Sequence, residues 1–254
     1  MIREHLFHKR AAADAKFRWR GGDVSRVEGF SDGVFALTLT LLVVTSTIPS
    51  TFHELFLVVR DLPVAIVTFA LITLAWHYHY LFFRRYGLED GVTIALNAVF
   101  LFLVVFFAYP LRFLATFLWY LVLGEPVDPL FAGGEGWITD VLSQRIWMMY
   151  FYGAGIIGVF GVLTLMTWRA LRLRAALELD ELEVFLMRTS MAHFLVPTVV
   201  ALVSILAVAL TSNPGLGGVL YFALGPLHFV VGLICGTRAE RLHKELLAGG
   251  GEGT

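Results

Sequence analysis

The sequence predicts an all-α integral membrane protein with six transmembrane helices in each subunit. Hydrophobic residues make up 58% of the 254 residues, charged residues only 15%, and the mean hydropathy is +0.77. A soluble domain carries about 25% charged residues, so this apolar excess cannot all be hidden in a water-soluble core. The apolar residues also form long runs that do not alternate with polar residues, as the strands of a membrane barrel would.

Six of these runs are long enough to cross a bilayer, which takes about 20 apolar residues in a helix. They cover 29–48, 62–83, 92–122, 146–168, 189–210 and 216–236. The third run contains Pro110, which predicts a kink. We therefore expect a basic cytoplasmic tail over 1–28, a six-span transmembrane domain over 29–236 and a second cytoplasmic tail over 237–254.

The positions of lysine and arginine predict how the chain is oriented. Sixteen of the 19 lie in the two tails and in the loops after the second and fourth runs, and only Arg60, Arg112 and Arg145 lie on the other side. Because cytoplasmic loops carry an excess of cationic residues, both termini are expected in the cytoplasm. The loop after the fourth run has apolar residues at helical spacing, which predicts a cytoplasmic helix over about 169–187.

The sequence lacks several common motifs of enzymes and cofactor sites. The sequence has no phosphate-binding loop, no H-E-x-x-H and no G-x-S-x-G, and its net charge of -1 does not indicate nucleic-acid binding. Gly153, Gly155 and Gly158 have G-x-G-x-x-G spacing, but inside an apolar run they predict close helix packing. His193 and His228 are interpreted as satisfied polar groups. We therefore expect no enzyme activity, no cofactor, no metal site and no nucleic-acid partner.

Polar residues at the start of the first run need an explanation. A carboxylate such as Asp32 is costly near a membrane unless it is paired or hydrated, although the positive end of the helix dipole helps it. Arg26 is a candidate partner, for Asp32 or for lipid phosphate. His77 in the second run lies at the same depth as Ser31 and Asp32, which predicts a hydrogen bond between the first two helices.

An apolar stripe follows on the same helix. Leu37, Leu41 and Val44 share one face, and Thr40 lies beside them. A stripe of branched apolar side chains is more often a packing seam than a pore lining. Periodicity alone therefore does not predict a channel, and the absence of T-V-G-Y-G excludes a filter built on that sequence.

The stretch Arg26-x-x-x-Phe30-Ser31-Asp32-Gly-Val-Phe-Ala36, followed by Thr40-Leu41-Leu42, resembles the signature of the transmembrane protein 175 family. Its members are potassium channels of endolysosomes and, in single-repeat form, of prokaryotes. Further support comes from Trp76-His77 in the second run and from Asn97 with Pro110 in the third.

The resemblance implies a homotetramer in a prokaryotic cell membrane, with first helices that line a central potassium pore. Its partners would be identical subunits and membrane lipid, and potassium would be the permeant ion. The implied constriction is Leu37, Leu41 and Val44, with Thr40 contributing to ion preference. The implied polar network that anchors the pore helix comprises Arg26, Phe30, Ser31, Asp32 and His77.

The main competing hypothesis is a proton-coupled secondary transporter in which Asp32 and His77 form a relay. Transporters commonly show internal repeats and helices broken at the membrane midplane. The sequence shows no such repeat, and the first run has no glycine or proline at its centre.

Overall fold

The computed structural model describes residues 17–44, 49–131, 133 and 138–249, and helices joined by short turns account for nearly all of them. The all-α prediction is confirmed. The helices are α2 (Arg26–Val44), α3 (Phe52–Arg60), α4 (Leu62–Tyr86), α5 (Gly91–Leu123), α6 (Val141–Arg172), α7 (Glu181–Thr211), α8 (Pro214–Leu220) and α9 (Leu224–Gly249), with 3-10 turns η2 (Asp128–Phe131) and η3 (Tyr221–Ala223).

Five segments of the described chain are long and apolar enough to cross a membrane. They are α4, α5, α6, α7 and the segment Pro214–His243, which runs from α8 into α9. Large apolar side chains such as Phe102, Leu206 and Phe229 are exposed along them, which a soluble protein would avoid over so wide a surface. An integral membrane protein is therefore supported. The first predicted span, 29–48, is not among these five. It lies mostly in α2, and residues 45–48 lie outside the described residues, so the count of six stays a prediction.

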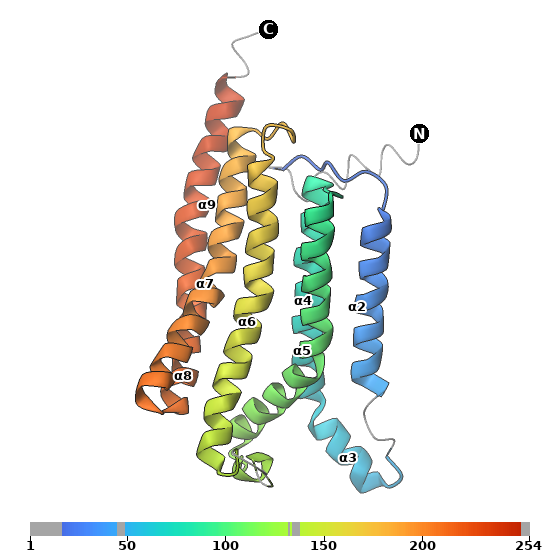
Figure 1. Cartoon of the computed structure of the whole chain (residues 1–254), viewed down its shortest axis with the longest axis vertical. Coiled ribbons are helices and arrows are strands. Elements are labelled where there is room, and N and C mark those ends of the chain that lie inside the picture. The colour runs from blue at the N-terminus through green and yellow to red at the C-terminus, as the bar shows by residue number, and fades with distance from the viewer. Residues whose placement is uncertain (1–16, 45–48, 132, 134–137, 250–254) are drawn as a thin grey trace.

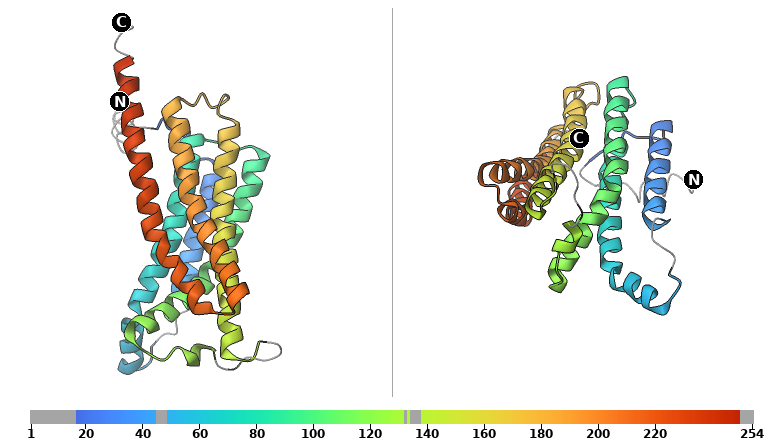
Figure 2. Two further views of the ribbon diagram at one scale, coloured as in Figure 1. Left: turned by 90° about the vertical axis from the view of Figure 1, so that its left-hand side faces the viewer. Right: turned by 60° about the horizontal axis from the view of Figure 1, so that its bottom comes forward.

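Helix α2 lies at one edge of the chain's helix bundle. It packs against α4 and α5, whereas α6, α7 and α9 gather on the far side of those two helices (Figures 1 and 2). Helix α5 is continuous but changes direction in its second half, and Pro110 lies inside it. The predicted kink follows because proline cannot donate the backbone hydrogen bond of a regular helix.

The turn between α4 and α5 is closed by capping groups. Gly87 ends α4 in the left-handed conformation, with φ 58°, and the Asp90 side chain accepts a hydrogen bond from the backbone of Val92 at the start of α5. The Thr93 hydroxyl, and then Arg169 at the end of α6, hold the pKa of the Asp90 carboxyl below its usual range. The Arg169 guanidinium lies 3.0 Å from Asp90 and thereby ties α6 to this turn.

The predicted cytoplasmic helix over 169–187 is wrong. Helix α6 ends at Arg172, the chain turns, and α7 begins at Glu181. The Asp180 side chain accepts a hydrogen bond from the backbone of Glu183, and the Glu183 side chain accepts one from the backbone of Asp180. This capping box starts a new helix where the apolar spacing alone suggested a continuous one.

The predicted span 216–236 does not form one continuous α-helix. Helix α8 ends at Leu220, η3 follows, and α9 begins at Leu224 and extends beyond 236. Pro226 lies in the first turn of α9, a position where proline is tolerated because its missing N–H would have no partner there.

One prediction about helix packing and one about hydrogen bonding are confirmed. A Cβ atom at Gly155 would lie 2.4 Å from the Phe107 ring of α5, and one at Gly153 would lie 2.8 Å from Ile205 of α7. These glycines therefore allow α6 to approach both neighbours closely. His193 and His228 form a hydrogen bond with each other, with 3.0 Å between their Nδ1 atoms.

Candidate functional site: the exposed face of α2 and its polar anchor

One face of α2 is buried inside the chain. Ser31 and Thr38 are 0% and 2% exposed, and Phe35 and Leu42 are buried with them. Their spacing of four, three and four residues places them on one side of a helix. Phe35 contacts the rings of His79 and Phe100, so this side packs against α4 and α5.

The opposite face of α2 is exposed. Leu37 is 59% exposed and Leu41 is 38% exposed, and Thr40 is exposed beside them. Val44 is the last residue of α2, and its side chain lies outside the described residues. The stripe of Leu37 and Leu41 is therefore not a packing seam within the chain, which was the alternative interpretation of its periodicity.

Thr40 offers oxygen lone pairs on this exposed face. Its hydroxyl donates a hydrogen bond of 2.8 Å to the carbonyl of Ala36, one turn earlier in the same helix. Because the hydroxyl proton is used within the helix, the remaining lone pairs can accept a hydrogen bond or bind a cation. Thr38 makes the same bond to Val34 but lies on the buried face.

A buried chain of hydrogen bonds connects α2, α5 and α4. The Ser31 hydroxyl donates to the carbonyl of Val27 at 2.7 Å and accepts from Nδ2 of Asn97 at 3.0 Å. The Oδ1 atom of Asn97 lies 2.9 Å from Nε2 of His79. Since that amide oxygen can only accept, Nε2 of His79 must carry the proton, and the direction of every bond is fixed.

Asp32 makes a separate link from α2 to α4. Nε1 of Trp76 donates a hydrogen bond of 2.8 Å to Oδ1 of Asp32, and the Trp76 ring stacks on Tyr80. The carboxylate itself is exposed in the subunit. This contact gives the charged residue a partner, as its position near the membrane requires.

The expected hydrogen bond from His77 to Ser31 or Asp32 is not the one that the structure shows. His77 is exposed and its ring contacts Tyr78, whereas the buried His79 joins the chain of hydrogen bonds. Helical spacing explains the difference, because His79 is seven residues after Ile72 and four before Phe83, and both of those are buried.

Two other residues of the expected network lie apart from it. Phe30 and Arg26 are exposed, and the ion pair described at this end of α2 joins Glu28 to Arg84, at 3.8 Å. The structure thus brings Ser31 and Asp32 into contact with neighbouring helices and adds Trp76, His79 and Asn97. We call these five residues the polar anchor.

Helix α2 is also held at its far end. Nη1 of Arg112 donates to the carbonyl oxygen of Leu42 at 3.3 Å. The last four carbonyls of a helix lack partners within it and carry its negative dipole, so a guanidinium there is favourable.

Asn97→Leu is expected to lower the free energy of unfolding by about 1–3 kcal/mol, because the buried Ser31 and His79 would each lose a partner. Unfolding midpoints of the purified protein in detergent would measure the loss. His77→Leu, on the exposed side of α4, serves as the control and should change little. Equal effects of the two substitutions would contradict the buried network.

Comparison with known proteins places these residues in a family. A family model described as "Endosomal/lysosomal potassium channel TMEM175" matches residues 26–108. A protein of Marivirga tractuosa named "Potassium channel" is 37% identical over 251 residues, which cover 93% of this chain and 98% of that protein. The chain belongs to the TMEM175 potassium channel family.

A solved structure of a TMEM175 protein resembles the chain as well. The crystal structure of the potassium channel MtTMEM175, a T38A variant in complex with a nanobody–MBP fusion protein, has a TM-score of 0.74 at 36% identity, and covers 87% of this chain and 97% of its own. A lysosomal potassium-selective channel TMEM175 homologue from Chamaesiphon minutus has a TM-score of 0.46 at 20% identity. The range matched by the TMEM175 family model contains the whole polar anchor and the described face of α2.

Proposed function

We propose that the chain is the subunit of a potassium-selective channel in which ions pass along the exposed face of α2. The observation that carries this proposal is the division of α2 into two faces. Ser31, Phe35 and Thr38 are buried against α4 and α5, whereas Leu37 and Leu41 face away from the subunit. The potassium channels among its relatives support the same function.

A pore of this kind needs several subunits. Each chain supplies one α2, and a closed ring of identical helices requires a symmetric oligomer. The position of α2 at the edge of the subunit favours this arrangement, because the other helices of the same chain do not enclose α2 (Figure 2). We propose a homotetramer with Leu37, Leu41 and Val44 around the axis.

A ring of leucines has a physical difficulty as a potassium pathway. It offers no oxygen to replace the hydration shell of an ion, and a narrow apolar constriction blocks ions by losing its water. Conduction therefore requires the ring to widen for a partly hydrated ion. Potassium holds its water less tightly than sodium and would lose less in passing, and Thr40 oxygens would supply part of the missing coordination.

The proposed orientation places the start of α2 in the cytoplasm of a prokaryotic cell. Helices α4, α6 and α9 end at the same end of the bundle, and each carries arginines there, such as Arg84, Arg169 and Arg238 (Figure 1). Arg60 and Arg145 lie at the opposite end, at the end of α3 and at the start of α6. This asymmetry is the one expected for cytoplasmic termini.

The proton relay of Asp32 and His77 has no support in the geometry. Asp32 bonds to Trp76, and His77 faces away from the polar anchor.

Recordings from purified protein in planar lipid bilayers test the proposed function. With potassium on one side and sodium on the other, the reversal potential should lie toward the potassium equilibrium potential. The current should persist without a proton gradient. Absence of potassium current, or a current that needs a proton gradient, would contradict the channel.

A further inference from the structure

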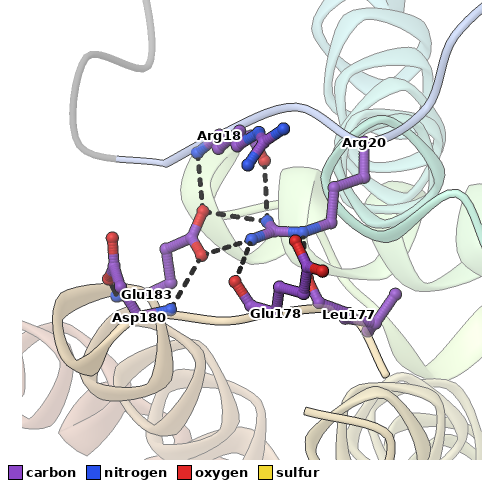
Figure 3. Close-up of polar contacts among 6 residues, drawn as sticks. All are labelled: Arg18, Arg20, Leu177, Glu178, Asp180 and Glu183. Atoms are coloured by element: carbon purple, nitrogen blue, oxygen red, sulfur yellow. Dashed lines mark hydrogen bonds and ion pairs between the residues drawn. The ribbon is translucent and has the colours of Figure 1, made fainter. Parts of the chain in front are cut away.

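The segment that precedes α2 crosses the end of the bundle and contacts helices far from it in sequence. We call residues 17–25 the strap. It runs from the α6–α7 turn, past the end of α4, to the start of α2 (Figure 1). Its best-defined contact is the cluster around Arg20 (Figure 3).

All five N–H donors of the Arg20 guanidinium are used. Nη1 and Nη2 donate to the two carboxylate oxygens of Glu183 at 2.8 and 2.5 Å. The other donors bind the carbonyl oxygens of Leu177, Glu178 and Arg18 at 2.6, 3.1 and 3.0 Å. A forked, fully bonded guanidinium of this kind fixes orientation as well as position.

Glu183 binds the strap and also takes part in the capping box of α7. Its side chain is 3% exposed and also accepts hydrogen bonds from the backbone N–H groups of Arg18 and Asp180. Because the bond to Asp180 is half of the capping box of α7, the strap is attached to the rigid first turn of a long helix.

The strap makes further close contacts on its way to α2. The backbone N–H of Gly21 donates to the carbonyl of Arg84 at 3.0 Å, and Nη1 of Arg84 donates to the carbonyl of Gly22 at 2.8 Å. A Cβ atom at Gly21 would lie 2.6 Å from the carbonyl oxygen of Phe83, so only glycine allows this approach. The strap therefore lies directly on the end of α4.

The strap ends at the first turn of α2. The backbone of Ser25 donates to the Glu28 carboxylate at 2.9 Å, and the backbone of Glu28 donates to the Ser25 hydroxyl at 3.1 Å, which is a capping box. Only residues 21–24 separate Arg20 from Ser25. An extended chain spans at most about 3.3–3.6 Å per residue, so bound Arg20 limits how far the start of α2 can move.

From these contacts we propose that Arg20 and Glu183 are positioning residues for ion conduction. Their ion pair holds the start of α2 in a fixed place relative to α7, and so sets the separation of the Leu37 side chains around the pore axis. This inference rests on the proposed function, because it assumes that α2 lines the pore.

Arg20→Gln and Glu183→Gln test the proposal in bilayer recordings. Each is expected to shift the potassium–sodium reversal potential toward zero, with a severalfold loss in permeability ratio. The double variant should shift the reversal potential no further than either single variant does, because both substitutions remove the same contact. Arg169→Gln is the matched control, since it breaks a 3.0 Å ion pair at the same end without touching the strap, and it should keep the wild-type reversal potential.

Arg20→Lys covers the case in which the glutamine variants do not assemble. It keeps the charge but loses the fork, so an intermediate reversal potential is expected. If the assembled Arg20 and Glu183 variants keep the reversal potential of the wild-type protein, the inference is overturned. The potassium current of the wild-type protein would in that case still support the channel. A wild-type protein without potassium current would instead overturn the proposed function, and the inference with it.

Discussion

Leu37→Ala is expected to raise the single-channel conductance and to weaken the preference for potassium over sodium. Leu37 is the most exposed described leucine of the α2 stripe, and truncating it removes three carbons from each subunit at the proposed constriction. A wider ring stays hydrated more readily, so both ions would pass with more of their water. Single-channel recordings in lipid bilayers measure the conductance, and the reversal potential measures the discrimination.

Leu39→Ala provides the control for this effect. Leu39 lies on the same helix but packs partly buried against the core shared with α4 and α5. Its truncation should affect stability more than conductance. If Leu37→Ala leaves the current unchanged, Leu37 is not the constriction.

Thr40→Val is expected to shift the reversal potential toward zero through a loss of potassium preference. Valine keeps the shape of threonine but removes the oxygen that Thr40 presents on the exposed face of α2. An ion at this level then loses a ligand, and the cost of its lost hydration is no longer offset. Bi-ionic reversal potentials measure the change.

Thr38→Val is the matched substitution on the buried face. Its hydroxyl also bonds to the carbonyl one turn earlier, but it points into the subunit and meets no ion pathway. It should leave selectivity unchanged. Equal shifts from both substitutions would show that the effect arises from the stability of α2, not from ion coordination.

Apolar run length was sufficient to predict the fold class and the positions of the long helices. It could not predict the break between α6 and α7, because a capping box at Asp180 and Glu183 is a local signal within a stretch of helical spacing. It also missed α3, since nine residues are too few to give a membrane signal.

The polar anchor was predicted only in part. Ser31 and Asp32 stood out because polar groups at the start of an apolar run need partners, but the choice of His79 over His77 depends on which side of α4 meets α5. Arg20 gave no signal in a basic tail. Its partner cannot be predicted from the sequence, because folding brings Glu183, 163 positions later, to within 2.5 Å.

The central claim is that the exposed face of α2 lines the pore. Cysteine accessibility tests this claim most directly. In a Cys235→Ser background, single cysteines at Leu37 and Leu41 report on the exposed face, and cysteines at Phe35 and Leu39 report on the face that packs against α4 and α5. A charged thiol reagent should block potassium current through the first pair and spare the second. Block at Phe35 and Leu39 with none at Leu37 and Leu41 would contradict a pore lined by this helix face.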